Sequence, residues 1–265
     1  MANRKGVCWM CGRPGPLTEE HTFPDWVRKI FAADGSDIVL SDHLAGMVNR
    51  SRTWTNRSGE VTVRSVCRDC NQGWMSKLEA RCRPLLQPLI TGHPARLSPA
   101  GQVDLALWAV KTAWVFQSRN ATTSTCRAEQ RQALAATLAL PAGVQVLLGA
   151  FHESGDVVLC TNWYVAGSTT AAQFDLDASA STMVIGRVVF QVIQRPATEA
   201  QGGRSTRQNA DPSAVHQVLP DTGQAVEWPP RRVLNEGDLN DFVTLPDFSA
   251  RTWETLPAIP GSQDF

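Results

Sequence analysis

The chain carries Cys8-Trp9-Met10-Cys11 and, further along, Cys67-Arg68-Asp69-Cys70-Asn71, and these two short segments determine how its first third folds. Each Cys-x-x-Cys turn offers two thiolates at the spacing that a tetrahedral zinc ion requires, so two such turns can close one site. Four thiolates leave no coordination position for a reacting water. We therefore predict a structural Zn²⁺ held by Cys8, Cys11, Cys67 and Cys70, with the chemistry carried by residues beside it.

The remaining cysteines and the start of the chain favour a reducing compartment. Seven cysteines is an odd number in a 265-residue chain, which is too large to need disulfide staples. Cys82, Cys126 and Cys160 stand outside the paired pattern and are expected to be buried thiols. The basic start runs directly into Cys8 without an apolar signal segment, and no stretch approaches about 18 consecutive apolar residues. We expect a soluble, cytoplasmic protein.

The composition is that of an ordinary folded protein. Hydrophobic residues make up 43% of the chain, and 25 Lys and Arg balance 25 Asp and Glu. This excludes a disordered chain, a fibrous repeat and a uniformly cationic coat protein. The charges are unevenly placed, because residues 1–83 hold 13 basic and 9 acidic residues. A slightly basic first third favours contact with phosphate only weakly.

The first third is expected to hold strands and helices around the cysteines. Leu17 to His21 is predicted as a strand, and Pro24 stands where it would begin a helix. Residues 34–60 are polar, and we expect mostly loop there. The β-branched segment Val61 to Val66 predicts a second strand. A helix is predicted from Asn71 to about Arg83, where Pro84 would stop it.

The rest of the chain is expected to form a separate α+β section. We divide the chain into a module of residues 1–83, a Pro-rich connector of residues 84–99 and a section of residues 100–265. Lys111 lies in an apolar helix, where its ammonium would reach for the surface. The elements predicted for this section are helices at about 100–117, 127–138 and 234–242, a polar segment at 202–212, β-rich segments at 144–151, 157–165 and 183–193, and a hairpin turn at 153–156.

A further motif lies between the two cysteine pairs. It reads Glu20-His21-Thr22-Phe23-Pro24, and the second cysteine pair runs directly into Asn71. This order resembles the zinc-stapled branch of the HNH endonucleases, which have the ββα-metal fold, and the resemblance covers roughly residues 6–83. It implies a fold of class α+β, with an N-terminal ββα-metal module followed by a helix and antiparallel-sheet section. Such nucleases often accompany phages, mobile elements or defence loci, so the resemblance implies a setting of that kind.

The resemblance also implies roles for three residues. His21 would be the general base that activates water, and Glu20 and Asn71 would hold one divalent cation, Mg²⁺ or Mn²⁺. Hydrolysis of a phosphodiester needs a base that titrates near neutrality and a hard cation with oxygen ligands. Adjacent residues on a strand point to opposite faces unless the backbone bends, which applies to Glu20 and His21.

Plainer interpretations of the same residues stay open. His21 can be a structural histidine beside the zinc, Glu20 a surface carboxylate, and Asn71 an N-cap that accepts from the first turn of its helix. The chain also departs from the HNH pattern, because the segment before Cys67 lacks an asparagine and the position one turn after Asn71 is apolar.

Two functions of different class follow from these observations. The first is a metal-dependent endonuclease that hydrolyses phosphodiester bonds of DNA, or of RNA, with Arg64, Arg68 and Lys77 as phosphate contacts. The alternative is a catalytically inactive, zinc-stapled module that binds nucleic acid or protein. In both, residues 100–265 would choose the substrate, a protein partner or a second copy of the chain.

Overall fold

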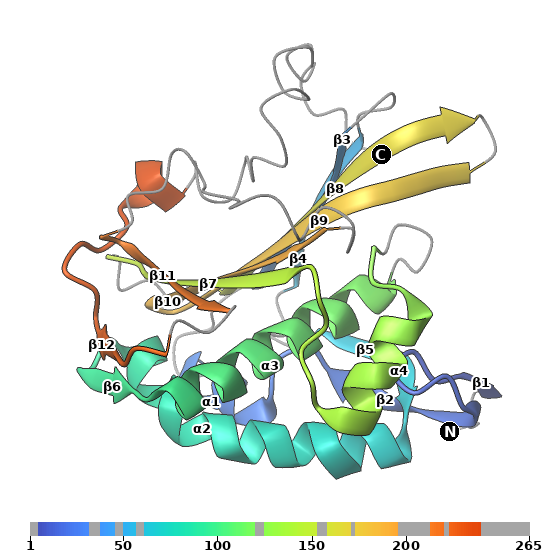
Figure 1. The fold of residues 1–265 in the computed structure, drawn as a ribbon, viewed down its shortest axis with the longest axis horizontal. Helices are drawn as coiled ribbons and strands as arrows, with labels where there is room; N and C mark the ends of the chain where they lie inside the picture. The colour runs from blue at the N-terminus through green and yellow to red at the C-terminus, as the bar shows by residue number, and fades with distance from the viewer. Residues whose placement is uncertain are drawn as a thin grey trace.

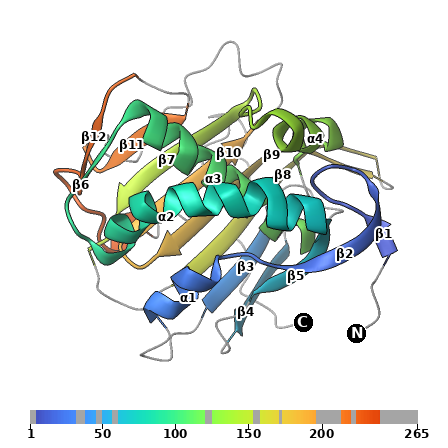
Figure 2. The same cartoon turned by 90° about the horizontal axis from the view of Figure 1, so that it is seen from below.

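The computed structural model describes residues 5–31, 38–45, 50–56, 61–119, 125–152, 158–170, 173–195, 213–219 and 223–239. Its helices and mostly antiparallel strands form an α+β fold in three layers (Figure 1). A large sheet forms the first layer, and α3 (Pro99–Gln117) and α4 (Ala128–Thr137) lie against one of its faces. Beyond them lie α2 (Ser76–Thr91), α1 (Asp25–Phe31) and a small sheet (Figure 2). The predicted fold class is confirmed.

The large sheet has seven described strands, and all neighbours pair antiparallel except β3 and β8, which are parallel. A two-residue turn at Gly186 and Arg187 joins β9 to β10, with Gly186 at a φ of 55° that suits glycine. The strand order is β11 (Val215–Leu219), β7 (Val144–Ala150), β10 (Val188–Gln194), β9 (Gln173–Ile185), β8 (Val158–Thr170), β3 (Ile38–Ala45) and β4 (Arg50–Asn56).

Two predictions for the sheet are wrong. Residues 34–60 were expected to be mostly loop, but β3 and β4 lie there and form a hairpin that pairs with the distant strand β8. The turn predicted at 153–156 lies outside the described residues, but the strands on either side of it do not pair, because β10 and β9 lie between β7 and β8. In both cases long-range pairing outweighs the local pattern. Residues 183–193 are β-rich as predicted, and the turn after Ile185 divides them between β9 and β10.

The small sheet contains the two strands predicted around the cysteines. Its order is β1 (Lys5–Val7), β2 (Pro14–His21) and β5 (Thr62–Cys67). A β-bulge interrupts the pairing, because Thr18 lies opposite Val66 whereas Glu20 lies opposite Val63. The extra residue belongs to β5, so Val63 and Val66 both face the interior. The predicted strands at 17–21 and 61–66 are confirmed, as is the helix after Pro24.

The helix that follows the second cysteine pair is longer than predicted. The segment Cys70–Met75 forms a π-helical turn that is kinked at Gly73, where the backbone is not helical (φ −92°, ψ −108°). The regular helix α2 follows and runs through Pro84 and Pro88 to Thr91. The two prolines are four residues apart and therefore share one side of the helix. Pro84 is exposed, so the backbone carbonyl groups that lose their N–H partners there remain open to water. The helix ends instead at Gly92, which is left-handed with a φ of 77°.

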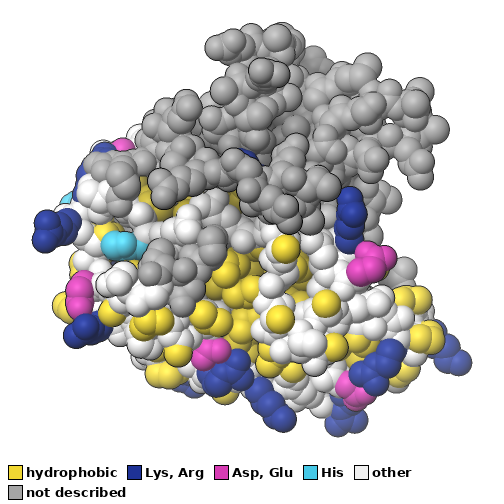
Figure 3. All heavy atoms as spheres, viewed as in Figure 1, with side chains coloured by type: hydrophobic (Ala, Val, Ile, Leu, Met, Phe, Trp, Pro, Cys, Tyr) yellow, Lys and Arg dark blue, Asp and Glu magenta, His cyan; other side chains and the backbone are white. Residues whose placement is uncertain are grey.

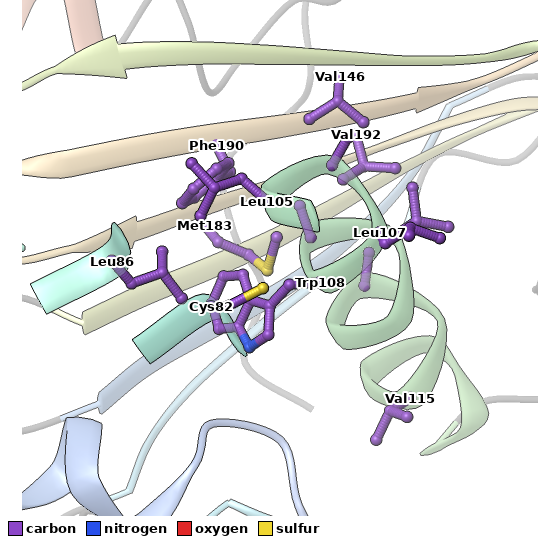
Figure 4. Close-up of a cluster of buried hydrophobic side chains, with 14 of the residues drawn as sticks. Cys82, Leu86, Leu105, Leu107, Trp108, Val115, Val146, Met183, Phe190 and Val192 are labelled. Atoms are coloured by element: carbon purple, nitrogen blue, oxygen red, sulfur yellow. The ribbon is translucent and has the colours of Figure 1, made fainter. Parts of the chain in front are cut away.

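The core joins the layers through α3, whose predicted extent is confirmed. Ser98 caps this helix, since its Oγ accepts from the backbone N–H of Gly101 at 3.2 Å. Trp108 is fully buried and contacts Phe190 of the large sheet, with ring centroids 5.6 Å apart. Figure 4 shows Trp108 with Cys82 of α2 beside it. One hydrophobic cluster therefore runs from the small sheet through α2 and α3 to the large sheet.

The division of the chain at residues 84–99 stays a prediction. Most of these residues form regular structure. Residues 84–91 belong to α2, and β6 (Ala95–Leu97) pairs with β12 (Val226–Trp228). The helix predicted at 127–138 is confirmed as α4, and residues 236–239 are helical within the predicted 234–242. The polar segment at 202–212 and residues 240–242 lie outside the described residues.

Candidate functional site

The four paired cysteines come together as predicted. Their Sγ atoms all lie within 4.8 Å of one another. The Sγ atoms of Cys8 and Cys70 are 3.9 Å apart, and those of Cys11 and Cys67 are 3.7 Å apart. A tetrahedral zinc ion with Zn–S bonds of about 2.3 Å places its sulfurs about 3.8 Å apart. The four residues therefore fit a metal ion such as zinc, which would join the β1–β2 turn to the end of β5 and the start of α2.

Polar groups around the sulfurs support this fit. The backbone N–H of Cys67 donates to Sγ of Cys8 at 3.2 Å, and Nε of Arg13 donates to Sγ of Cys11 at 3.4 Å. Such N–H···S contacts stabilise thiolate charge and orient the ligands of a metal. Arg13 also pairs with Asp69 in the second cysteine turn, at 3.0 Å. The two cysteine turns are thus tied together by side chains as well as by the cysteines.

Trp9, inside the first cysteine turn, connects the cysteine cluster to the helices. Its Nε1 donates to the backbone carbonyl of Trp114 in α3 at 2.9 Å. The guanidinium of Arg131, from α4, stacks 3.6 Å from the centre of the Trp9 ring, and its Nε donates to the Trp9 carbonyl at 2.7 Å. Arg131 also donates to the carbonyl of Cys126. The contacts of Trp9 are not visible in the sequence, because they join residues more than a hundred positions apart.

Glu20 points into the interior, where it meets a buried lysine. Its Oε1 lies 3.7 Å from Nζ of Lys111, which is fully buried in α3. The same Nζ lies 2.6 Å from Oε1 of Glu79, on α2. The expectation that the Lys111 ammonium reaches the surface is wrong, because two carboxylates satisfy its charge inside the protein. The signal that the sequence offered was a single lysine in an otherwise apolar helix.

The three charges perturb one another. Burial raises the pKa of Glu20 to about 7, and the nearby charge of Lys111 offsets part of this effect. Burial alone would lower the pKa of Lys111, but the charges of Glu79 and Glu20 outweigh it and raise that pKa. Two carboxylates share one ammonium, and Glu79 is the closer partner. Burial therefore disfavours the charged form of Glu20.

His21 lies on the other face of β2, as alternation along a strand requires. Glu19 shares this outer face, because it is two residues away. Its Oε2 accepts from Nη2 of Arg64 at 3.1 Å. The hydrogen bond from Arg64 lowers the pKa of Glu19, with smaller contributions from the Thr62 hydroxyl and from the charge of His21. Glu19 is therefore the carboxylate on the His21 face, and the motif in the sequence does not point to it.

Asn71 ties the start of the π-helical turn to β2. Its Nδ2 donates to Oγ1 of Thr18 at 3.1 Å and to the backbone carbonyl of Glu19 at 3.0 Å. The N-cap position belongs to Asp69 instead, and no side chain caps the turn. The interpretation of Asn71 as an N-cap is therefore wrong.

The side chains of Glu20 and Asn71 have different partners. The carboxylate of Glu20 lies beside Lys111, whereas the amide of Asn71 donates to Oγ1 of Thr18 and to the backbone carbonyl of Glu19. Among the described residues, the four cysteines form the one cluster of three or more His, Cys, Asp or Glu side chains that could hold a metal ion. A cation shared by Glu20 and Asn71 stays a prediction.

The predicted phosphate contacts lie on successive elements. Arg64 is on β5 and pairs with Glu19, and Arg68, in the second cysteine turn, donates to Oε1 of Gln72 at 2.7 Å. Lys77 is exposed at the start of α2. Figure 3 shows Lys and Arg side chains along the lower rim of the molecule, where α2 runs, with acidic side chains among them. This surface is mixed in charge.

No helix among the described residues has both the length and the hydropathy to span a membrane. Comparisons of the chain with protein-family models, with curated proteins and with solved structures find no match.

Proposed function

We propose that the chain is a zinc-stapled endonuclease of the HNH type, which hydrolyses phosphodiester bonds of DNA with His21 as its general base. The observation that carries the proposal is the arrangement around the cysteine cluster. Two antiparallel strands, β2 and β5, are followed by α2, and the clustered cysteines come from the turn before β2 and from the junction of β5 with α2. His21 ends the first strand, and the side chain of Asn71 bonds that same strand.

The chemistry of the outer face is suited to this role. His21 is partly exposed, so a water molecule and a phosphate can reach it. The imidazole of a histidine can accept the proton of an attacking water. Arg64, Arg68 and Lys77 supply cations for the phosphate backbone. A hard divalent cation, when bound, would stabilise the charge that develops on the phosphate and the leaving oxygen.

The test is incubation of the purified, zinc-loaded chain with supercoiled plasmid in Mg²⁺, Mn²⁺ or EDTA. The wild type is expected to nick or linearise the plasmid only with a divalent cation, and His21→Ala is expected to abolish this activity with zinc content unchanged. His152→Ala is the matched control, because His152 is exposed and lies outside the unit around the cysteines. Retention of full activity by His21→Ala would refute the proposal.

A second candidate function is favoured by one observation, the contact between Glu20 and Lys111. Because Lys111 holds the carboxylate that the resemblance assigns to a catalytic cation, the chain can instead be a zinc-stapled module that binds nucleic acid or protein without cutting. Under this alternative, fluorescence anisotropy would detect binding of a DNA duplex that His21→Ala leaves unchanged, and no cation would produce cleavage.

The proposal includes a cellular setting and a role for the large sheet. Four close cysteines that fit a metal ion suit a reducing compartment, so we place the protein in the cytoplasm. The elements after α2 would then select the substrate, a protein partner or a second copy of the chain.

A further inference from the structure

We propose that the cysteine cluster is a peroxide-sensitive switch, in which Cys11 and Cys67 form a disulfide and the metal ion is released. This inference goes beyond the proposed function and rests on the cluster alone, so it holds whether or not the chain cuts DNA. Three observations carry it: the unequal exposure of the four sulfurs, the short distance between the two accessible ones, and an arginine placed on one of them.

The four clustered cysteines divide into a buried pair and an accessible pair. Cys8 and Cys70 are 1% and 2% exposed, whereas Cys11 and Cys67 are partly exposed. Cysteines that hold a metal ion are thiolates, so access to solvent decides which of them an oxidant meets. Peroxide is therefore directed to Cys11 and Cys67. The cysteines outside the cluster do not compete, because all of them are buried, namely Cys82, Cys126 and Cys160.

The two accessible cysteines are also close enough to react with each other. Sγ of Cys11 lies 3.7 Å from Sγ of Cys67. Redox-sensitive cysteines typically have a second cysteine beside them that resolves the first product of oxidation. The two residues belong to different turns, since Cys11 lies between β1 and β2 and Cys67 ends β5. A bond between them therefore joins the two cysteine turns directly.

Arg13 supports the reaction at Cys11. Its Nε donates to Sγ of Cys11 at 3.4 Å, and its guanidinium pairs with Asp69 at 3.0 Å. A cation beside a cysteine stabilises the thiolate once the bond to the metal is broken. The same charge stabilises the hydroxide that leaves when peroxide is reduced. Because the side chain of Arg13 is 60% exposed, it lies on the side from which peroxide arrives.

The reaction balances with hydrogen peroxide as the oxidant. The Cys11 thiolate attacks one peroxide oxygen, so an S–O bond forms, the O–O bond breaks and the departing hydroxide takes a proton from solvent. The Cys67 thiolate then attacks Sγ of the resulting sulfenic acid, which forms the S–S bond and expels a second hydroxide that is protonated in turn. Two thiolates, one peroxide and two protons thus give one disulfide and two water molecules.

Loss of two ligands releases the metal ion and loosens the strand that carries His21. A tetrahedral site that keeps only Cys8 and Cys70 has lost half of its ligands. Asn71, directly after Cys70, donates to the backbone carbonyl of Glu19 and so attaches β2 to the second cysteine turn. Metal binding and local folding are coupled in such sites, so release of the ion weakens this attachment.

The test adds hydrogen peroxide to the zinc-loaded full chain. Zinc that leaves the protein is measured by the absorbance of its complex with pyridylazoresorcinol, and disulfides are mapped by mass spectrometry after alkylation of the free thiols. We expect zinc release to accompany a disulfide between Cys11 and Cys67. Dithiothreitol with added zinc is expected to restore the starting state, because a thiol exchanges with the disulfide.

Two arginine variants keep all four cysteines and make the test specific. Arg13→Met removes the cation from Sγ of Cys11, and the rate of zinc release is expected to fall about tenfold, as the loss of one charge-assisted hydrogen bond predicts. Arg68→Met is the matched control, because Arg68 lies in the second cysteine turn and donates to Gln72. It is expected to release zinc at the wild-type rate.

Three results would overturn the proposal. The first is zinc that stays bound in peroxide, and the second is a mapped disulfide that leaves out Cys11 or Cys67. The third is release from Arg13→Met that is no slower than release from Arg68→Met.

Plasmid cleavage separates the switch from the nuclease function. If peroxide releases zinc through the bond between Cys11 and Cys67 but the untreated chain leaves the plasmid intact, the switch stands and the nuclease function fails. If the untreated chain cuts the plasmid but peroxide leaves the zinc in place, the nuclease function stands and the switch fails. If both hold, cleavage is expected to fall in step with zinc release.

Discussion

The ammonium nitrogen of Lys111 lies 3.7 Å from Oε1 of Glu20, and this contact determines which of two adjacent glutamates faces His21. Lys111 belongs to α3, the helix that packs under the large sheet, whereas Glu20 belongs to the small sheet. Breaking a buried ion pair by removing one partner costs about 3–5 kcal/mol. Glu20 is therefore fixed in the interior, and Glu19 is left for the surface.

Replacement of Lys111 by Met should destabilise the protein strongly. The variant leaves Glu20 and Glu79 in the interior without their shared cation, so the free energy of unfolding at pH 7 should fall by about 3–5 kcal/mol. Urea unfolding followed by circular dichroism measures this change. Lys77→Met is the control, because Lys77 is exposed, and it should change the stability little. Equal stability of the two variants would show that the triad does not form.

The stability should also depend on pH through Glu20. Its pKa is about 7 in the folded protein and about 4.5 in the unfolded chain. Between these values the folded state keeps a proton that the unfolded state has released, so stability falls as pH rises from 4.5 to 7. The difference amounts to at most about 3 kcal/mol. Glu20→Gln should remove this slope, measured as the change in unfolding midpoint between pH 5 and pH 8. A slope that is the same in Glu20→Gln as in Glu227→Gln would contradict the assignment.

One zinc ion should bind per chain through the four cysteines. Cys67→Ser removes one thiolate from the cluster and should reduce zinc content and disrupt the small sheet, because binding and folding of such a site are coupled. Metal analysis of the purified protein measures the loss. Cys160→Ser replaces a buried cysteine outside the cluster and should keep a full complement of zinc. Loss of zinc from both variants to the same extent would argue against this cluster.

Arg131→Lys should weaken the attachment of the first cysteine turn to α4. Lysine keeps the charge but cannot both stack on Trp9 and donate to two backbone carbonyls. We expect a loss of about 1–2 kcal/mol in the free energy of unfolding. Thermal unfolding measures the effect, with Arg96→Lys as the control at an exposed ion pair. An unchanged midpoint in Arg131→Lys would mean that the stack on Trp9 contributes nothing to stability.

The sequence predicts those parts of the structure that depend on local patterns. The cysteine cluster follows from two Cys-x-x-Cys turns, and α3 follows from an apolar stretch that begins at Ser98. By contrast, β3 was missed because its partner β8 lies far along the chain, and a polar segment gives little sign of such pairing. Pro84 was misjudged because a proline on the exposed side of a helix interrupts only bonds that water can replace.

The arrangement of the candidate site could be predicted from the sequence only in part, because it too depends on contacts between distant segments. Strand alternation required Glu20 and His21 to point in opposite directions, but it could not say which of them faces inward. That choice depends on Lys111, which reaches β2 only when α3 packs against the small sheet. Glu19 then shares the outer face of β2 with His21, a conclusion that needs the packed structure.

The parallel pairing of β3 with β8 also sets an order of assembly during synthesis. The cysteine cluster is complete once residue 70 has left the ribosome, so its metal can bind early. The hairpin of β3 and β4 lies in the loop between the two cysteine pairs, yet Ile38 pairs with Val158, which is made much later. If a metal ion binds the four cysteines as soon as they are made, the β3–β4 hairpin is enclosed in a metal-closed loop before its partner strand β8 has been synthesised.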